Sequence, residues 1–325
     1  MKARIIGTGS YAPEKVVTNS DLEKFLDTTD EWIVTRTGIK QRHVAADNEA
    51  TSDLATRAAQ NALEMAGVDP AELDLIVMGS VTGDFPFPAC ACLVQKNLAA
   101  KKAVAFDLSA ACSGFIFGLS TADQYHKTGR VKKSLVIGAE IMTRTVNWDD
   151  RSTCVLFGDG AGAVVMETME GERGILSTHL HTDGSRWELL YQAGFGSRTP
   201  PSHAGIDEGA YFIKMAGNEV FKVAVCSLTD VAIEALEANG VTREEVALII
   251  PHQANQRILD ATGKRLKVPP EKIFSNVASY ANTSAASIPI ALDEAHRSGQ
   301  IKEGDLVVLN AFGSGFTSGA ALIRW

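Results

Sequence analysis

The sequence predicts an α/β fold built from two similar halves, and two observations support this prediction. Short continuous apolar runs alternate with amphipathic stretches along the 325 residues. This pattern is typical of mixed or parallel sheets whose two faces are covered by helices. Three segments also recur in the same order, which indicates a duplicated α/β unit. The matched segments are 66–77 with 239–250, 128–137 with 298–308, and 157–160 with 312–315.

The break between the halves is expected in the stretch Gly171-Glu172-Arg173-Gly174. The N-terminal half would then be residues 1–172 and the C-terminal half residues 173–325. The longest irregular stretch, residues 193–208, contains several Gly, Ser and Pro residues. We expect a loop there, either mobile or serving as a lid.

Composition and charge argue against several classes of protein. The chain is 45% hydrophobic and 22% charged, which is ordinary for a globular protein with an ample core. No apolar run reaches the roughly 20 residues that a membrane span needs, and residues 1–7 are expected to form a strand rather than a signal peptide. The net charge of −8 argues against broad nucleic-acid binding. The five cysteines form neither a disulfide framework nor a zinc pattern, so we expect no metal and a reducing cytoplasm.

Cys112 is the first candidate for chemistry. It follows the apolar strand predicted over 103–108 and stands at the start of a helix expected from about Ser113. The unpaired N–H groups and the dipole of a helix start favour the thiolate, which is the nucleophilic form. A cysteine in such a place is often just a small buried hydrophobic residue, so other residues must support a catalytic role.

His252 and Asn282 supply that support. His252 directly follows the strand predicted over 247–250, and Asn282 lies between a strand expected over 273–278 and a helix expected over 284–296. Asn282 is also 170 residues after Cys112, which is the offset between Thr128 and Ser298 in one matched pair. All three reactive side chains are therefore expected just past the carboxyl ends of strands, where the active sites of α/β sheets gather.

A glycine-rich turn follows the last predicted strand, which covers residues 305–310. Its sequence is Phe312-Gly313-Ser314-Gly315-Phe316. Glycine lets backbone N–H groups approach a substrate closely, as the oxyanion hole of an acyl-transfer enzyme requires. A tight turn between strands is the alternative. The order Cys, His, Asn is also that of papain-like proteases, but neither their cysteine signature nor a sign of secretion is present.

The chain resembles β-ketoacyl-acyl-carrier-protein synthase III, the initiating condensing enzymes of bacterial type II fatty-acid synthesis, within the thiolase-like superfamily. The resemblance extends from Ile5 to Thr317. One departure is Gly-Ser-Gly at 313–315 in place of the frequent Gly-Gly-Gly, which a backbone N–H donor at Ser314 tolerates. The motifs that carry the resemblance are Asp30-Glu31-Trp32-Ile33, Arg36-Thr37-Gly38-Ile39, Cys112-Ser113-Gly114-Phe115, 158–163 (GDGAGA), 215–221 (MAGNEVF), Pro251-His252-Gln253-Ala254-Asn255 and Ala281-Asn282-Thr283-Ser284.

The resemblance implies a thiolase-like duplicated fold, layered αβαβα with two central mixed sheets. It also implies that Cys112 takes an acyl group from a short acyl-CoA such as acetyl-CoA, with the N–H groups of Cys112 and Ser314 holding the oxyanion. Malonyl-acyl-carrier-protein would then lose CO₂. His252 and Asn282 would donate hydrogen bonds to the resulting enolate, which attacks the acyl-cysteine. Phe312 or Phe316 would shield the departing carboxylate from water.

The resemblance also implies contacts with substrates and partners, and no cofactor beyond coenzyme A as part of the substrate. Phe87 would reach the acyl pocket of a second subunit, which implies a homodimer. The acidic carrier protein would need a local basic surface on this acidic chain. Residues expected to bind coenzyme A are Thr28, Trp32, Arg36, Arg151, Gly217, Asn218, Asn255 and Phe312, and those expected to bind the carrier protein are Lys222, Gln253, Arg257, Lys264 and Arg265.

Three other functions stay open at this point. A related condensing enzyme of secondary metabolism would share these motifs. A Cys-His-Asn hydrolase would release free acid from acyl-CoA and need no malonyl donor. A non-catalytic scaffold is disfavoured because Cys112, His252 and Asn282 are all present.

Overall fold

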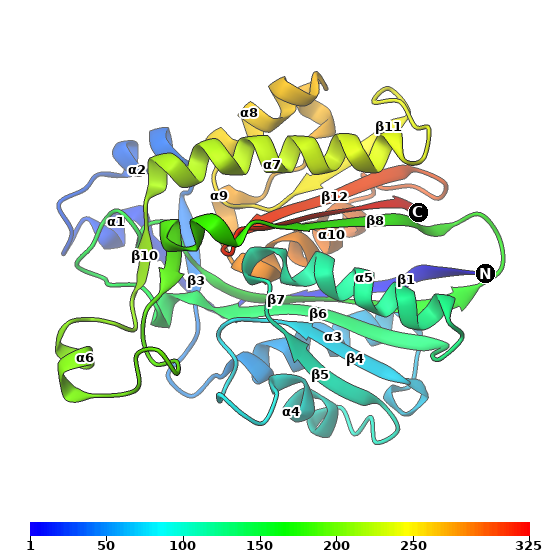
Figure 1. Cartoon of the computed structure of the whole chain (residues 1–325), viewed down its shortest axis with the longest axis horizontal. Coiled ribbons are helices and arrows are strands. Elements are labelled where there is room, and N and C mark those ends of the chain that lie inside the picture. The colour runs from blue at the N-terminus through cyan, green and yellow to red at the C-terminus, as the bar shows by residue number, and fades with distance from the viewer.

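The computed structural model describes residues 1–325 and contains two stacked sheets, both of them mixed (Figure 1). In the first sheet β4 runs parallel to β5 and β6, whereas β7 runs antiparallel to β1 and β6. In the second sheet only β11 and β12 are parallel. The first sheet has the order β1 (Lys2–Tyr11), β7 (Asp159–Met169), β6 (Lys133–Ile141), β4 (Leu75–Gly79), β5 (Val104–Leu108), and the second the order β11 (Val246–Pro251), β12 (Leu306–Gly313), β13 (Thr317–Arg324), β8 (Gly174–Thr182).

Helices form the other three layers. Two lie between the sheets, where Phe115, Leu119 and Leu292 pack into a core shared with the inner faces of both sheets. Figure 1 shows the remaining long helices on the outer faces, below the first sheet and above the second. The predicted αβαβα order is therefore confirmed. The central helices are α5 (Gly114–Lys127) and α10 (Ser287–Arg297); the outer ones are α3 (Thr51–Ala66), α4 (Cys90–Asn97), α7 (Gly217–Glu237) and α8 (Gln256–Leu266).

Most of the smaller strands and helices lie at one end of the sheets (Figure 1). The stretch expected to be a loop, 193–208, is irregular apart from one short helix that begins in it. No helix of the chain combines the length and the apolar character that crossing a bilayer demands. The smaller elements are β2 (Lys15–Thr18), α1 (Asn19–Leu22), α2 (Asp30–Thr37), β3 (Gln41–Val44), β9 (Leu190–Gln192), α6 (His203–Asp207), β10 (Ile213–Met215), α9 (Val277–Tyr280) and 3-10 turns at Pro70–Glu72, Ala111–Ser113, Met142–Arg144, Gly184–Leu189, Pro270–Lys272 and Ser284–Ala286.

The strand expected over 273–278 is wrong. Ile273 makes a single bridge with Ile249, and the chain then turns into α9. The carbonyl of Asn276 accepts the N–H groups of Ser279 and Tyr280 at 3.0 and 3.3 Å, which starts this helix. The apolar run is too short and too interrupted by polar residues to extend the sheet. Asn282 therefore follows a short helix rather than a strand.

Candidate active site

Cys112 lies in the 3-10 turn Ala111–Ser113, between the end of β5 and the start of α5. Ala111 takes the left-handed conformation with φ 46°, which turns the chain sharply. The end of β12 is pressed against this turn. A Cβ atom on Gly313 would lie 2.7 Å from the amide nitrogen of Cys112, so only glycine fits there.

His252 stands directly after β11, and its backbone N–H donates to the carbonyl of Asn310 at 2.8 Å. Its ring Nδ1 lies 2.6 Å from the Ser287 hydroxyl oxygen. The other hydrogen bond of that oxygen is with the N–H of Gln253 at 3.3 Å, and this group is a donor. Nδ1 is therefore the acceptor available to the hydroxyl proton of Ser287. We therefore assign the ring proton to Nε2. Burial lowers the pKa of His252 to about 4, so the imidazole is neutral at pH 7.

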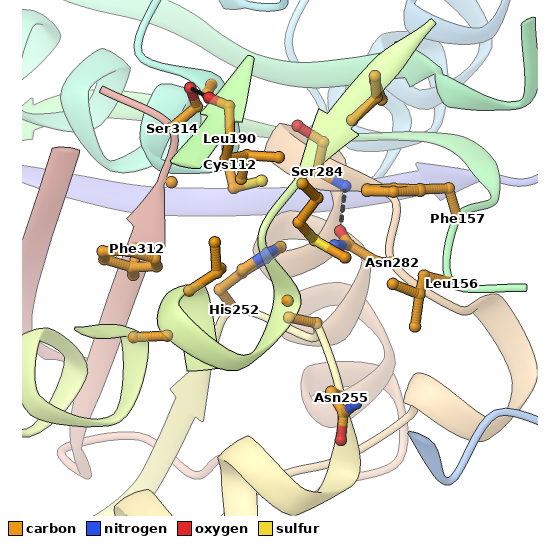
Figure 2. A pocket seen from close by; sticks show the side chains of 18 of the residues that line it. Cys112, Leu156, Phe157, Leu190, His252, Asn255, Asn282, Ser284, Phe312 and Ser314 are labelled. Atoms are coloured by element: carbon orange, nitrogen blue, oxygen red, sulfur yellow. Dashed lines mark hydrogen bonds between the residues drawn. The ribbon is translucent and has the colours of Figure 1, made fainter. Parts of the chain in front are cut away.

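Asn282 is held by both halves of the chain. Its backbone bonds with the strand-like segment of the first half, to Leu156 at 2.9 Å and from Gly158 at 3.1 Å. Its side-chain Oδ1 accepts the N–H of Ser284 at 2.8 Å, the dashed line in Figure 2. The other end of the carboxamide, Nδ2, makes no hydrogen bond with the protein and stays available as a donor.

The three side chains meet in one cavity of about 1040 Å³, in which Figure 2 shows them around a common space. Cys112, His252 and Asn282 are 9%, 3% and 8% exposed. The cavity extends from them past Phe312 to the exposed Arg257. The structure thus brings together the residues that the sequence selected, and joins them to the surface.

The electrostatics of Cys112 differ from the expectation. Burial raises the pKa of its thiol to about 12, while the Ser284 hydroxyl and the cysteine's own backbone N–H lower it. Burial therefore opposes the effect of the helix start, which favours the thiolate. A nearby proton acceptor would help the thiol to attack.

The backbone N–H groups of Cys112 and Ser314, expected from the sequence to be oxyanion donors, lie in neighbouring turns. Ser314 lies in the turn that joins β12 to β13, next to Gly313 and hence beside the Cys112 turn. The backbone hydrogen bonds of turns and loops include none from the N–H of Ser314 or Cys112. The Ser314 hydroxyl donates to the carbonyl of Leu190, so it points away from the cysteine (Figure 2).

Comparison with known proteins agrees with this geometry. A family model described as 3-oxoacyl-[acyl-carrier-protein (ACP)] synthase III matches residues 106–184, and its C-terminal counterpart matches residues 236–325. The β-ketoacyl-[acyl-carrier-protein] synthase III of Caldanaerobacter subterraneus subsp. tengcongensis is 52% identical over 323 residues, 99% of this chain and 98% of the relative. The crystal structure of 3-oxoacyl-[acyl-carrier-protein] synthase III from Aquifex aeolicus is 51% identical with a TM-score of 0.92, covering 99% of this chain and 100% of that one.

The chain belongs to the 3-oxoacyl-[acyl-carrier-protein] synthase III family. It is thus an acyltransferase, the initiating condensing enzyme of fatty-acid synthesis, with a thiolase-like fold. The priming β-ketosynthase of the R1128 polyketide pathway shares the fold at a TM-score of 0.92 but is only 35% identical, over 99% of this chain and 96% of that one. The higher identity with the fatty-acid enzymes favours primary over secondary metabolism.

In this synthase, three of the residues expected to bind coenzyme A cluster at the cavity mouth. The guanidinium carbon of Arg36 lies 4.5 Å from the centre of the Trp32 ring, and that of Arg151 lies 5.1 Å from it. Arg151 also pairs with Asp27 at 3.2 Å. The indole is therefore already in contact with two cations.

The remaining coenzyme candidates are placed differently from one another. Gly217 and Asn218 begin α7 and line the cavity, as does Phe312. Asn255 also lines it, but its Oδ1 caps α8 and its Nδ2 donates to the carbonyl of Arg36 at 3.1 Å. Thr28 is not a lining residue, and its buried hydroxyl has no hydrogen-bond partner.

The synthase presents four of its five carrier-protein candidates on the surface. Lys222 and Arg257 are exposed and line the cavity, while Lys264 and Arg265 lie further along α8. Arg265 pairs with Asp230 at 3.4 Å.

Gln253 was predicted as a further carrier-protein contact, and this prediction is wrong. It is 1% exposed, its Nε2 donates to the carbonyls of Pro251 and Phe274, and its Oε1 accepts the N–H of Asn276. A buried amide with all these bonds cannot reach a partner. Phe87, by contrast, is 85% exposed and does not line the cavity of its own chain.

Three buried polar residues near the site were not expected from the sequence: Glu140, Ser284 and Ser287. Glu140 carried a signal, because a carboxylate within the otherwise apolar strand Ser134–Ile141 conflicts with burial on both faces. The serines carried none, since their importance depends on what packs against them.

Proposed function

We propose that this synthase joins the acyl group of acetyl-CoA to malonyl-acyl-carrier-protein, giving 3-oxoacyl-acyl-carrier-protein, CoA and CO₂. One observation carries the proposal. Cys112, His252 and Asn282 line a single cavity, and the ring and carboxamide each keep an N–H donor free of protein partners. A nucleophile facing two neutral donors suits acyl transfer followed by stabilisation of an enolate.

In the first half-reaction Cys112 attacks the thioester carbonyl of the acyl-CoA. The charge that develops on the carbonyl oxygen is stabilised by the N–H groups of Cys112 and Ser314, whose closeness is supported by the contact at Gly313. CoA then leaves, and the acyl group stays on the sulfur.

In the second half-reaction the malonyl group loses CO₂, and the thioester oxygen becomes an enolate. Nε2 of His252 and Nδ2 of Asn282 donate to that oxygen. A carboxamide cannot act as an acid or base, so a donor role accounts for Asn282. The carbanion attacks the acyl-Cys112. Phe312, 4% exposed and lining the cavity, keeps water from the departing carboxylate, and Phe316 packs behind it with ring centres 4.8 Å apart.

Coenzyme A would place its adenine between Trp32 and Arg151. A flat ring needs about 3.5 Å on each side, whereas these groups are now 5.1 Å apart. Arg151 must therefore swing away from the indole, and its pairing with Asp27 must loosen. Thr28, Gly217, Asn218, Asn255 and Arg36 remain the other proposed contacts along this path.

The acyl carrier protein would dock where Lys222 and Arg257 meet the cavity, with Lys264 and Arg265 extending the basic surface. All four side chains are exposed. We also propose a cytoplasmic homodimer in which the exposed Phe87 reaches the acyl pocket of the second subunit. The duplication into halves 1–172 and 173–325 is a further proposal. It is supported by the point at which the chain passes from the first sheet to the second, because β7 ends at Met169 and β8 begins at Gly174.

Labelled acetyl-CoA tests this function. The protein is mixed with it, the labelled peptide is identified by mass spectrometry, and malonyl-acyl-carrier-protein is then added. We expect label on Cys112, none on a Cys112→Ala variant, and transfer into a 3-oxoacyl product. Release of free acetate without a malonyl donor would instead show a hydrolase, and no label would contradict acyl transfer.

A further inference from the structure

Glu140 is a buried carboxylate that the mechanism above does not use. It is 0% exposed and lies near the end of β6. It accepts the N–H groups of Val81 and Thr82 at 3.1 and 3.0 Å and the hydroxyl of Ser80 at 3.1 Å. None of these neighbours is a cation. A buried carboxylate without a cation is costly, so its presence beside an active site suggests a use.

Ser284 connects Glu140 with the nucleophile. Its hydroxyl donates to Oε1 of Glu140 at 3.1 Å. The turn that carries Ser284 packs beside the turn that carries Cys112, since a Cβ on Gly114 would lie 3.3 Å from the Cβ of Ala285. The Ser284 hydroxyl also lowers the pKa of the Cys112 thiol. The side chains of Cys112 and Ser284 both line the pocket of Figure 2, beside Asn282. Because a hydroxyl that donates to a carboxylate has lone pairs left to accept, the order Cys112–Ser284–Glu140 leads a proton from sulfur to carboxylate.

We propose that Glu140 is a positioning residue that, through the hydroxyl of Ser284, takes the proton of Cys112 when the thiol attacks. The inference rests on the proposed acyl-transfer function.

The proton balance closes over the two half-reactions. The S–H proton passes to Oγ of Ser284 while the Ser284 hydroxyl proton passes to Oε1 of Glu140, which leaves a thiolate and a neutral acid. CoA departs as a thiolate and takes a proton from water. When the carbanion displaces Cys112 from the acyl group, the sulfur leaves as a thiolate and regains its proton from Glu140 along the same path.

The imidazole of His252, which lines the same cavity as Cys112, is less suited to accept this proton. Burial lowers the pKa of His252 to about 4, and its Nδ1 is engaged by Ser287. Burial raises the pKa of Glu140 to about 7, against the hydrogen bonds that lower it. The groups around Glu140 from the end of β4 and from Ser284 are neutral, and Cys112 is the titratable group coupled to it. Glu140 is thus the better proton acceptor at neutral pH.

The pH dependence of Cys112 reactivity tests the inference in the full-length protein. Glu140→Gln keeps the shape of the side chain, and Ser284→Ala removes only the hydroxyl. Two rates are followed from pH 6 to 10 on the Cys112 peptide by mass spectrometry: alkylation by iodoacetamide and acylation by acetyl-CoA. Following the peptide separates Cys112 from the exposed Cys92 and Cys226. We expect both variants to be about tenfold slower at pH 7 and to recover at high pH.

Asp123→Asn is the matched control, because it removes another buried carboxylate from α5 far from the cavity. It is expected to keep the wild-type pH profile. Wild-type pH profiles in Ser284→Ala would overturn the relay even if Glu140→Gln fails to fold. If wild-type protein is alkylated at Cys112 but not acylated, the proposed function fails while the relay can still be judged from alkylation.

Discussion

Two turns of the molecule invite comparison: Ala111–Ser113 in front of α5 and Ser284–Ala286 in front of α10. Both are 3-10 turns that lead into a central helix. Both begin with a non-glycine residue in the left-handed conformation, at φ 46° and φ 50°. The counterpart of Cys112 is therefore Ala285, and not Asn282 as the offset of 170 suggested. The reason is that α5 has 14 residues and α10 has 11, so the two helices match at their ends but not at their starts.

Each turn rests on a glycine from the other half. A Cβ on Gly313 would lie 2.7 Å from the amide nitrogen of Cys112, and one on Gly138 would lie 2.1 Å from the carbonyl oxygen of Ala285. The two turns thus have the same support but different content. One carries Cys112, the proposed nucleophile; the other carries Ser284 and, just before it, Asn282, which are proposed to assist. The residues proposed for the chemistry are thus divided between two turns of similar geometry.

The largest effect should come from breaking the shared support. In Gly138→Ala, the new methyl group would overlap the backbone of Ala285, which cannot move without shifting α10. We expect a loss of about 4 kcal/mol or more in the free energy of unfolding, measured by denaturant titration. Gly184→Ala has nothing within 4 Å of the new atom and should change stability little. A stable Gly138→Ala would show that the turns do not depend on this contact.

The variants His252→Ala and Asn282→Ala test whether these two side chains serve the second half-reaction rather than the first. Each removes one donor to the enolate, which costs about 10²-fold or more in the condensation step. Acylation of Cys112 should fall much less, because neither side chain contacts the oxyanion donors of the first step. The two half-reactions are measured separately in single-turnover experiments. Equal losses in both would contradict the assignment.

The free energy of unfolding is expected to depend on pH in opposite directions for the buried acid Glu140 and the buried base His252. The pKa of Glu140 is raised from 4.5 to about 7, so the folded state binds the extra proton and stability falls as pH rises through this window. The pKa of His252 is lowered from 6.5 to about 4, so the unfolded state binds the extra proton and stability rises with pH there. Each difference corresponds to about 3 kcal/mol.

The two terms oppose each other in the wild type. Compared with it, Glu140→Gln should gain stability at pH 7.5 relative to pH 4.5, and His252→Gln should gain it at pH 4.5 relative to pH 7.5. Unfolding in denaturant at several pH values measures both changes. Parallel curves for wild type and Glu140→Gln would mean that this carboxylate titrates normally in the folded protein.

The smallest effect is expected at the surface of the second half. Arg257→Glu should weaken the use of malonyl-acyl-carrier-protein by about tenfold through reversed charge, while acylation by acetyl-CoA is kept. Rates are compared at low and high salt, since screening should reduce the difference. Lys302→Glu is the control, because Lys302 is exposed and lies just before the start of β12, at the end of the strand away from the cavity. Equal losses in both half-reactions would argue against a docking role for Arg257.

Much of this arrangement could be predicted from the sequence, because it depends on local patterns. Apolar runs placed the strands over residues 1–7, 103–108, 247–250 and 305–310 approximately, and motifs selected Cys112, His252 and Asn282, which line one cavity. The prediction of a strand over 273–278 was wrong because two apolar pairs separated by Ser275 and Asn276 do not decide between sheet and helix. The prediction that Gln253 contacts the carrier protein was wrong because the direction of a side chain after a strand depends on the buried carbonyl groups around it. The sequence does not show where those groups lie.

Asn282 shows how little room the site leaves for chemical change. Its oxygen is tethered to the N–H of Ser284, so the amide cannot flip. Conversion to aspartate, as slow deamidation in an ageing protein produces, would preserve that tether and the shape of the pocket. In the proposed mechanism it would also turn a negative oxygen toward the atom that becomes anionic when CO₂ departs. Such a protein would fold normally, still load its acyl group, and stall there.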